Sequence, residues 1–251
     1  MRQKNNWYVF EDVLGVTPIG TENNLFTLGI DSIKAIRAVS KARAAGLEIS
    51  VKQIMTVGTI RKLAEVAVRK VEQVQDQKEV TGEVVLLPIQ RSFLEEGLAK
   101  PDHYNQSVIF ESEYPLNEES VRMVVRELAI HHDMLRAIYN GKQIIQSVEE
   151  STLYDWKSFD LTELREEEIE EVVRTENTRL QASMSLERGP LFKVAFYQKK
   201  HASILMFTIH HMVVDGVSWR ILLEDFETAY HQVERGQQIK LPAKTVSYST
   251  W

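Results

Sequence analysis

The sequence contains no cysteine among its 251 residues. This absence excludes a disulfide framework, a thiolate metal site and a cysteine nucleophile. No apolar run approaches the roughly 20 residues that a membrane-spanning helix needs, and the first ten residues lack the apolar stretch of a secretion signal. Acidic residues outnumber basic ones by 36 to 30, so a basic face for nucleic acid is not expected. We therefore expect a cytoplasmic protein without nucleic-acid or membrane partners.

What the sequence does contain is enough apolar material for packed cores, with 43% hydrophobic and 26% charged residues. The chain changes character near residue 71, where the polar stretch VEQVQDQKEVTG has no aromatic residue. Such a stretch is typical of a linker. We therefore predict an α+β protein with two domains, over residues 1–70 and 84–251, joined by a linker over residues 71–83.

The first segment has helical periodicity, interrupted by a loop that contains Gly15, Pro18 and Gly20. Three helices and one short turn of helix are predicted, which together form a small bundle of three or four helices. Gly46 is a plausible end for the second of them, and Thr59 is a good N-cap for the last. The predicted ranges are 7–14, 33–44, 51–55 for the short turn, and 60–67.

The second segment mixes helices and strands. The spacing of apolar residues predicts helices over 88–99, 118–130, 164–182 and 218–233, and strands over 107–111, 135–139, 142–148, 191–198 and 203–209. The dipeptide Asn140-Gly141 predicts a hairpin between the second and third of these strands. Because helices and strands alternate irregularly, we expect an α/β sandwich.

Ser32 stands at the head of a predicted helix, behind a loop that contains Gly29. The first amide groups of a helix are unpaired and attract an anion, so a phosphodiester on this hydroxyl would be well placed. The alternative is that Asp31 or Ser32 only caps the helix.

The string from Asn24 to Ile36 (NLFTLGIDSIKAI) resembles the attachment motif of peptidyl carrier domains of non-ribosomal peptide synthetases, with Ile30 in place of the second glycine. The resemblance covers about residues 5–70. It implies that a phosphopantetheinyl transferase attaches 4′-phosphopantetheine to Ser32, which would supply the sulfur that the chain lacks. In that family, Asp31 before the serine is similar to carriers that precede an epimerization domain. Ile33 and Ile36 are then either partly exposed contacts for partner domains or part of the core.

Two adjacent histidines, His210 and His211, follow the apolar run 203–209. Neighbouring side chains in a strand point to opposite faces, so at most one of the two can aim into a given cavity. A zinc site would need a third ligand, and we predict no metal. Taken alone, the pair could be two structural histidines.

The longer string from His210 to Tyr230 (HHMVVDGVSWRILLEDFETAY) resembles the His-His-x-x-x-Asp-Gly signature of the condensation superfamily of peptide synthetases. Ser218-Trp219 after the glycine is similar to the epimerization branch. Four further stretches resemble motifs of this branch or of the superfamily, and the match runs from about residue 84 to 251. The resemblance implies one lobe of a two-lobed, chloramphenicol acetyltransferase-like fold. The four stretches are PIQ at 88–90, HYNQS at 103–107, HHDMLR at 131–136 and GPLF at 189–192.

This resemblance implies an amino acid epimerase that interconverts the L and D configurations at Cα of a carrier-bound thioester. His211 is then the catalytic acid or base, because an imidazole exchanges protons near neutral pH. His210 and Asp215 are implied to shape the site, with Asp215 paired to Arg136.

Full epimerization domains have a second lobe with a catalytic glutamate, and no motif for it occurs in the chain. We therefore expect a fragment that is inactive by itself. The implied partners are an upstream adenylation domain, the missing C-terminal lobe and a downstream condensation domain. Two alternatives stay open: a fragment of an amide-forming condensation domain, and a carrier with a non-catalytic docking platform. The sequence does not indicate which amino acid is handled.

Overall fold

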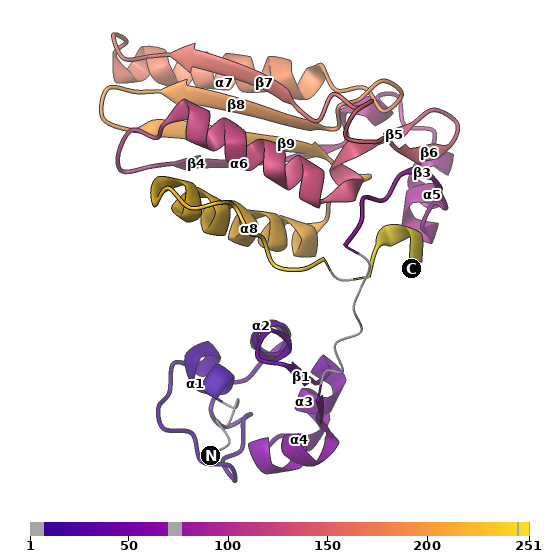
Figure 1. The fold of residues 1–251 in the computed structure, drawn as a ribbon, viewed down its shortest axis with the longest axis vertical. Coiled ribbons are helices and arrows are strands. Elements are labelled where there is room, and N and C mark those ends of the chain that lie inside the picture. Colours follow the sequence, from indigo (N-terminus) through magenta and orange to yellow (C-terminus); the bar gives the residue numbers. More distant parts are fainter. Residues whose placement is uncertain (1–7, 70–76, 245, 251) are drawn as a thin grey trace. The chain divides into compact units, whose positions relative to one another are not determined.

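The computed structural model describes residues 8–69, 77–244 and 246–250. The chain divides into two compact units, a first unit of residues 1–75 and a second unit of residues 76–251 (Figure 1). Of the linker predicted over 71–83, residues 71–76 lie outside the described residues, as does Trp7 of the first predicted helix. No helix in the described part of the chain is long and apolar enough to cross a membrane.

The first unit is a bundle of short helices, as predicted. Its buried core contains Phe10, Leu25, Ile54 and Leu63, each with no exposed surface. A small antiparallel pair of strands, which the sequence did not predict, also belongs to this unit. The elements are α1 (Tyr8–Leu14), α2 (Ser32–Ala44), β1 (Leu47–Glu48), α3 (Val51–Val57), α4 (Ile60–Val66) and β2 (Val68–Arg69).

Two helices of the first unit begin at side chains that accept backbone hydrogen bonds. Ser50 and Gln53 form a reciprocal capping box at the start of α3, and the predicted cap Thr59 accepts from the amide of Lys62 at the start of α4. Gly46, the predicted end of α2, lies just beyond it with φ of +80°, a conformation that glycine adopts without strain.

A four-stranded sheet forms the centre of the second unit. Its order is β4-β9-β8-β7. Strand β9 is antiparallel to both of its neighbours, β4 and β8, and β7 runs parallel to β8. The edge strand β7 was not predicted, because it is half exposed and polar at four of its six positions. The strands are β4 (Asn105–Glu111), β7 (Asp155–Asp160), β8 (Phe192–Gln198) and β9 (Ser203–His210).

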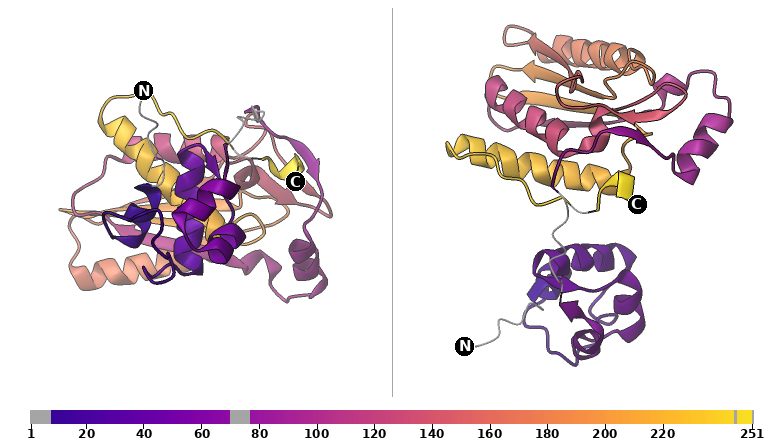
Figure 2. Two further views of the ribbon diagram at one scale, coloured as in Figure 1. Left: turned by 90° about the horizontal axis from the view of Figure 1, so that it is seen from below. Right: turned by 45° about the vertical axis from the view of Figure 1, so that its right-hand side comes forward.

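Helices cover both faces of this sheet, which confirms the predicted sandwich (Figure 2). On one face of the sheet, Leu205, Phe207 and Ile209 of β9 pack against two helices. On the other face, Ile204 and Met206 of the same strand pack against a third helix. This alternation follows from the two-residue period of a strand. The first two helices are α6 (Glu118–His131) and α8 (Gly216–Glu234), and the third is α7 (Glu166–Ala182).

A second sheet of three short strands has the order β3-β6-β5. The predicted hairpin around Asn140-Gly141 is confirmed, and Gly141 has φ of +70°. Residues 82–84, which include the end of the predicted linker, form β3 and pair with β6. The remaining elements are β3 (Gly82–Val84), α5 (Pro88–Glu95), η1 (Pro101–His103), η2 (Asp133–Arg136), β5 (Ala137–Tyr139), β6 (Gln143–Ile145) and η3 (Tyr248–Thr250).

Candidate functional site

Ser32 is the first residue of α2, and its side chain is exposed. The cap of this helix is its neighbour, because the Oδ1 atom of Asp31 accepts a hydrogen bond of 2.7 Å from the amide of Lys34. The hydroxyl of Ser32 forms no hydrogen bond to another described residue. Ser32 is therefore free of the capping role that the alternative interpretation gave to either residue.

The loop before Ser32 is tied to the rest of the first unit. The amide of Leu25 donates to the carbonyl of Gly58 at 2.8 Å, and the Nζ atom of Lys34 donates to the carbonyl of Gly29 at 2.9 Å. Gly29 has φ of +87°, which favours glycine at this turn. The loop thus holds the Ser32 hydroxyl at the N-terminal end of a 13-residue helix, where the helix dipole favours a phosphodiester. An exposed hydroxyl at this place fits 4′-phosphopantetheine.

Two large apolar side chains lie on the surface of α2 near Ser32. Ile33 is 71% exposed and Ile36 is 44% exposed. The alternative that placed them in the core is therefore wrong, and their role as partner contacts stays a prediction.

His210 is fully buried at the end of β9. Its Nδ1 atom accepts a hydrogen bond from the amide of Met212 at 3.1 Å, so the ring proton must lie on Nε2, which donates to the carbonyl of Pro101 at 2.9 Å. Burial lowers the pKa of His210 although the contact with Pro101 opposes the shift. Both nitrogens are thus occupied, which suits a residue that shapes the site.

His211 is half-buried just beyond the end of β9. Its ring stacks on Tyr104, with 5.3 Å between the ring centroids, and its amide donates to the carbonyl of the same tyrosine at 2.9 Å. The Nδ1 atom lies 2.7 Å from the carbonyl oxygen of Val214. The Nε2 atom lies 3.1 Å from the side-chain nitrogen of Gln106. The ring is therefore fixed on one face and at both nitrogens.

Gln106 and Trp219 complete the surroundings of His211. The indole Nε1 atom of Trp219 donates to the Oε1 atom of Gln106 at 2.8 Å. Both residues lie within the sequence motifs, but no role was predicted for either. The available signal was strand parity, because Gln106 of β4 lies opposite Ile209 and so shares a face of the sheet with α8.

Asp215 caps the N-terminus of α8. Its Oδ1 atom accepts hydrogen bonds of 2.7 Å from both the amide and the hydroxyl of Ser218. Burial by itself would raise the pKa of Asp215, but these hydrogen bonds and the attraction of His211 together lower it. The carboxylate thus fixes the turn that follows the two histidines.

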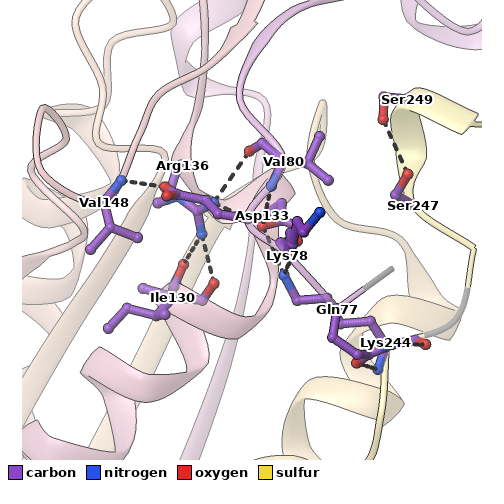
Figure 3. Close-up of polar contacts among 12 residues, drawn as sticks. Gln77, Lys78, Val80, Ile130, Asp133, Arg136, Val148, Lys244, Ser247 and Ser249 are labelled. Carbon is purple, nitrogen blue, oxygen red and sulfur yellow. Dashed lines mark hydrogen bonds and ion pairs between the residues drawn. The ribbon is translucent and has the colours of Figure 1, made fainter. Parts of the chain in front are cut away.

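The prediction that Asp215 pairs with Arg136 is wrong. The guanidinium of Arg136, whose side chain has no exposed surface, donates to the carbonyls of Ala129 and Ile130 at 2.7 and 2.8 Å and forms an ion pair of 2.8 Å with Asp133. Figure 3 shows this arrangement at the end of α6. The chain turns back there, so the guanidinium satisfies the unpaired carbonyls at that helix end.

One group of side chains outside the predicted site could hold a metal ion. His131, His132 and Asp225 each offer a ligand atom, and these atoms lie within 4.8 Å of one another. The Nε2 atom of His132 lies 2.9 Å from the Oδ2 atom of Asp225, as in an ordinary hydrogen bond. Burial, followed by the neighbouring His132, lowers the pKa of His131. Neither predicted histidine belongs to this group.

A pocket of about 250 Å³ also lies in the second unit. Its lining includes Ile130 and His131 of α6, and Ile239 and Leu241 from the segment after α8. None of the predicted site residues lines this pocket, so the pocket is separate from the site predicted around His211.

Two protein families match the chain. The Condensation domain matches residues 80–251, and the Phosphopantetheine attachment site matches residues 9–67. Gramicidin S synthase 1 of Brevibacillus brevis is 39% identical over 247 residues, which are 97% of this chain and 22% of that protein. Tyrocidine synthase 1 of Brevibacillus parabrevis is 36% identical over 248 residues, which are also 97% of this chain and 22% of that protein.

Solved structures share the fold of the second unit. The epimerization domain from the third module of tyrocidine synthetase B has a TM-score of 0.67 and 37% identity, over 70% of this chain and 41% of that one. The starter condensation domain of rhizomide synthetase has a TM-score of 0.57 at 16% identity, over 66% of this chain and 39% of that one, which shows the fold alone.

The chain thus spans about a fifth of the length of these two synthases. Both family matches agree with the motifs around Ser32 and around the two histidines. The chain belongs to the condensation-domain family of non-ribosomal peptide synthetases, with a phosphopantetheine attachment domain ahead of the condensation-type domain.

Proposed function

We propose that the chain carries an aminoacyl or peptidyl thioester on Ser32 and contributes the first lobe of an epimerization domain. Three features support epimerization over amide formation: Asp31 before the attachment serine, Ser218-Trp219 after the Asp-Gly of the histidine motif, and the likeness at 37% identity to an epimerization domain. The 4′-phosphopantetheine arm supplies a flexible tether and the sulfur of the thioester when it is bound.

The orientation of His211 is the observation that carries this proposal. Because its Nδ1 atom faces the carbonyl of Val214, that nitrogen must hold the ring proton, and the lone pair lies on Nε2. A half-buried imidazole with its lone pair on a fixed nitrogen is equipped to accept a proton.

The proposed step moves one proton at a time. His211 accepts the proton from Cα on Nε2, and the electron pair of the broken C–H bond is delocalised onto the thioester carbonyl. A second acid on the opposite face returns a proton to Cα, so that only the configuration changes. The family resemblance implies a glutamate for this second role, in a motif that these 251 residues do not contain.

The proposal includes partners that act before, with and after this chain. A phosphopantetheinyl transferase modifies Ser32, and an upstream adenylation domain loads the amino acid. A C-terminal lobe completes the epimerization site, and a downstream condensation domain receives the D residue.

Exchange of the Cα proton tests the function. The synthetase that contains this chain is loaded with an aminoacyl thioester and incubated in deuterated water, and deuterium at Cα is measured by mass spectrometry. We expect exchange in the wild type and a loss of about 10²-fold or more in His211→Ala, which is the usual size of a general acid–base contribution. Ser32→Ala abolishes loading, whereas Ser50→Ala, at the start of another helix of the same unit, leaves it unchanged.

Undiminished exchange in His211→Ala would refute the role of that residue. If the loaded wild type forms an amide bond with a second carrier-bound group and shows no exchange at Cα, the domain is a condensation domain. If it does neither, the second unit is a docking platform.

A further inference from the structure

The hydrogen-bond chain from Trp219 through Gln106 to His211 has a fixed direction. An indole nitrogen can only donate, so the Oε1 atom of Gln106 must be the acceptor of the 2.8 Å contact with Trp219. The side-chain nitrogen of Gln106 therefore points at the Nε2 atom of His211, 3.1 Å away, and donates to it. The indole thus decides which end of the amide faces the imidazole.

The other side of the ring gives the same assignment independently. A carbonyl oxygen can only accept, so the 2.7 Å contact with Val214 requires a proton on the Nδ1 atom of His211. A neutral imidazole has one ring proton, so the Nε2 atom is the acceptor that Gln106 needs. Two contacts from different elements, β4 and the turn after β9, agree on one tautomer.

We infer that Gln106, oriented by Trp219, is a positioning residue that holds His211 in the Nδ1-protonated tautomer with the basic lone pair on Nε2. The inference rests on the proposed function, because a fixed lone pair matters only if His211 transfers protons. It assigns His211 the part of a base in the resting enzyme. The single lone pair of Nε2 cannot accept from Gln106 and from Cα at once, so the substrate must displace the Gln106 amide from Nε2 when the proton is transferred.

The same geometry offers no acceptor to a proton on the Nε2 atom of His211. When Nε2 is protonated, it faces the donor end of the Gln106 amide, and the amide cannot turn without leaving Trp219 unpaired. The neutral ring with its proton on Nδ1 is therefore the form that satisfies all of these contacts.

Other groups that act on His211 do not depend on Gln106. Asp215 at the start of α8 attracts the charged imidazole, His210 at the end of β9 repels it, and the ring of Tyr104 stacks on it. All three stay in place in the variants below, so a change in His211 can be attributed to the relay from Trp219 through Gln106.

Long-range ¹H–¹⁵N correlation spectra of the imidazoles in the full 251-residue chain test the inference. We expect the ring proton of His211 on Nδ1 and, in the same spectrum, the ring proton of His210 on Nε2, since the latter donates to Pro101. The opposite tautomers of two adjacent residues give an internal reference. The signals that disappear in His211→Ala are those of His211.

Gln106→Glu is the most informative variant. Glutamate has the size of glutamine, but it presents an acceptor to the Nε2 atom of His211 in place of a donor. A carboxylate accepts from both Trp219 and His211, so the doubly protonated ring should persist to a pH higher by about one unit or more. Trp219→Phe removes the anchor of the amide, which can then turn its oxygen toward Nε2; because Val214 still favours the proton on Nδ1, a minor population with the proton on Nε2 is expected beside the Nδ1 form. The matched control is Trp156→Phe, whose indole donates to Glu118 and not to Gln106; the His211 signals should not change.

Intact His210 signals show that each variant is folded. If a substituted chain loses them, Gln106→Met serves as the second variant: the contact with Val214 should keep the ring proton on Nδ1, and the Nε2 resonance should move to that of an imidazole nitrogen without a hydrogen bond. A wild-type His211 with its proton on Nε2, or an unchanged titration of His211 in folded Gln106→Glu, would overturn the inference.

A kinetic measurement separates this inference from the proposed function. In the loaded synthetase, the acidic limb of the pH profile for Cα exchange should move upward in Gln106→Glu by the same shift that the spectra show. If the wild type shows no exchange while the spectra behave as expected, the proposed function fails and the positioning role of Gln106 stands. If exchange occurs but its profile is unchanged in Gln106→Glu, the positioning role fails alone.

Discussion

The two units treat their reactive groups in opposite ways. The first unit exposes the hydroxyl of Ser32 at the start of a helix, beside the exposed Ile33. The second unit surrounds the half-buried ring of His211 with a stacked tyrosine and hydrogen bonds at both nitrogens. Under the proposed function this contrast has a reason, because a carrier serine has to be reached by other proteins, whereas a base has to be oriented before its substrate arrives.

The same contrast extends to how the units are held together. The first unit depends on a small apolar core and on helix caps at its surface. The second unit has larger cores and also encloses charged groups, of which Arg136 is the clearest. Substitutions should therefore affect the two units to different degrees.

Arg136→Ala should have the largest effect, which is to destabilise the second unit. It removes the charge-assisted hydrogen bonds to the carbonyls of α6 and leaves Asp133 with Lys244 as its remaining ion-pair partner among the described residues. We expect the free energy of unfolding of the second unit to fall by about 3–5 kcal/mol, measured by urea titration. The exposed pair of Arg174 with Glu171 provides the control, and Arg174→Ala should leave stability unchanged. An equal effect of the two substitutions would contradict the structural role of Arg136.

The same leucine-to-alanine substitution in each core compares the stability of the small core with that of the large one. Leu63 of the first unit and Leu205 of the second are both fully buried. Each change to alanine should cost about 2–5 kcal/mol, but the first unit, with 75 residues, is the smaller of the two and has less stability to lose. Hydrogen exchange measured by mass spectrometry should show the first unit largely unfolded in Leu63→Ala, and the second unit still folded in Leu205→Ala. Persistence of a protected first unit in Leu63→Ala would mean that its core is stronger than its size suggests.

The pH dependence of stability should be a property of the second unit. Burial lowers the pKa of His210 from the ordinary value of 6.5, so the unfolded chain takes up a proton first as the pH falls. The second unit should therefore have its full stability above about pH 6.5 and lose stability below it, by at most about 1.4 kcal/mol per pH unit for this group. Burial lowers the pKa of His131 as well, so His131 adds to the same slope.

The measurement is the free energy of unfolding across about pH 5 to pH 7.5, the range in which a histidine titrates, by urea titration. His210→Gln should reduce the slope without removing it, and the exposed His201→Gln should not change it. An identical slope in wild type and His210→Gln would show that burial of His210 does not control the acid limb.

Local patterns predicted most of the secondary structure. Apolar spacing predicted α6 and α8 to within about two residues at either end, and Asn140-Gly141 predicted its hairpin. Strand β7 could not be found in this way, because pairing with β8 rather than its own apolar pattern makes it a strand. The same holds for the three residues of β3, which pair with β6 about sixty positions later.

The partner of Arg136 shows the limit of resemblance. The motif predicted a charged pair with Asp215, but each of the two groups satisfies a helix end close to it in the chain. The turn of the chain after α6 brings the guanidinium to the carbonyls at that helix end, and the motif does not encode this turn.

The sequence by itself determined the chemistry that each unit can offer. The serine after Gly29-Ile30-Asp31 and the histidine pair at the end of an apolar strand can be read from neighbouring residues, because helix starts and strand ends are local features. The tertiary structure alone decided which group faces the Nε2 atom of His211. That choice depends on Gln106 and Trp219, which are 113 positions apart in the chain and meet only where β4 and α8 come together.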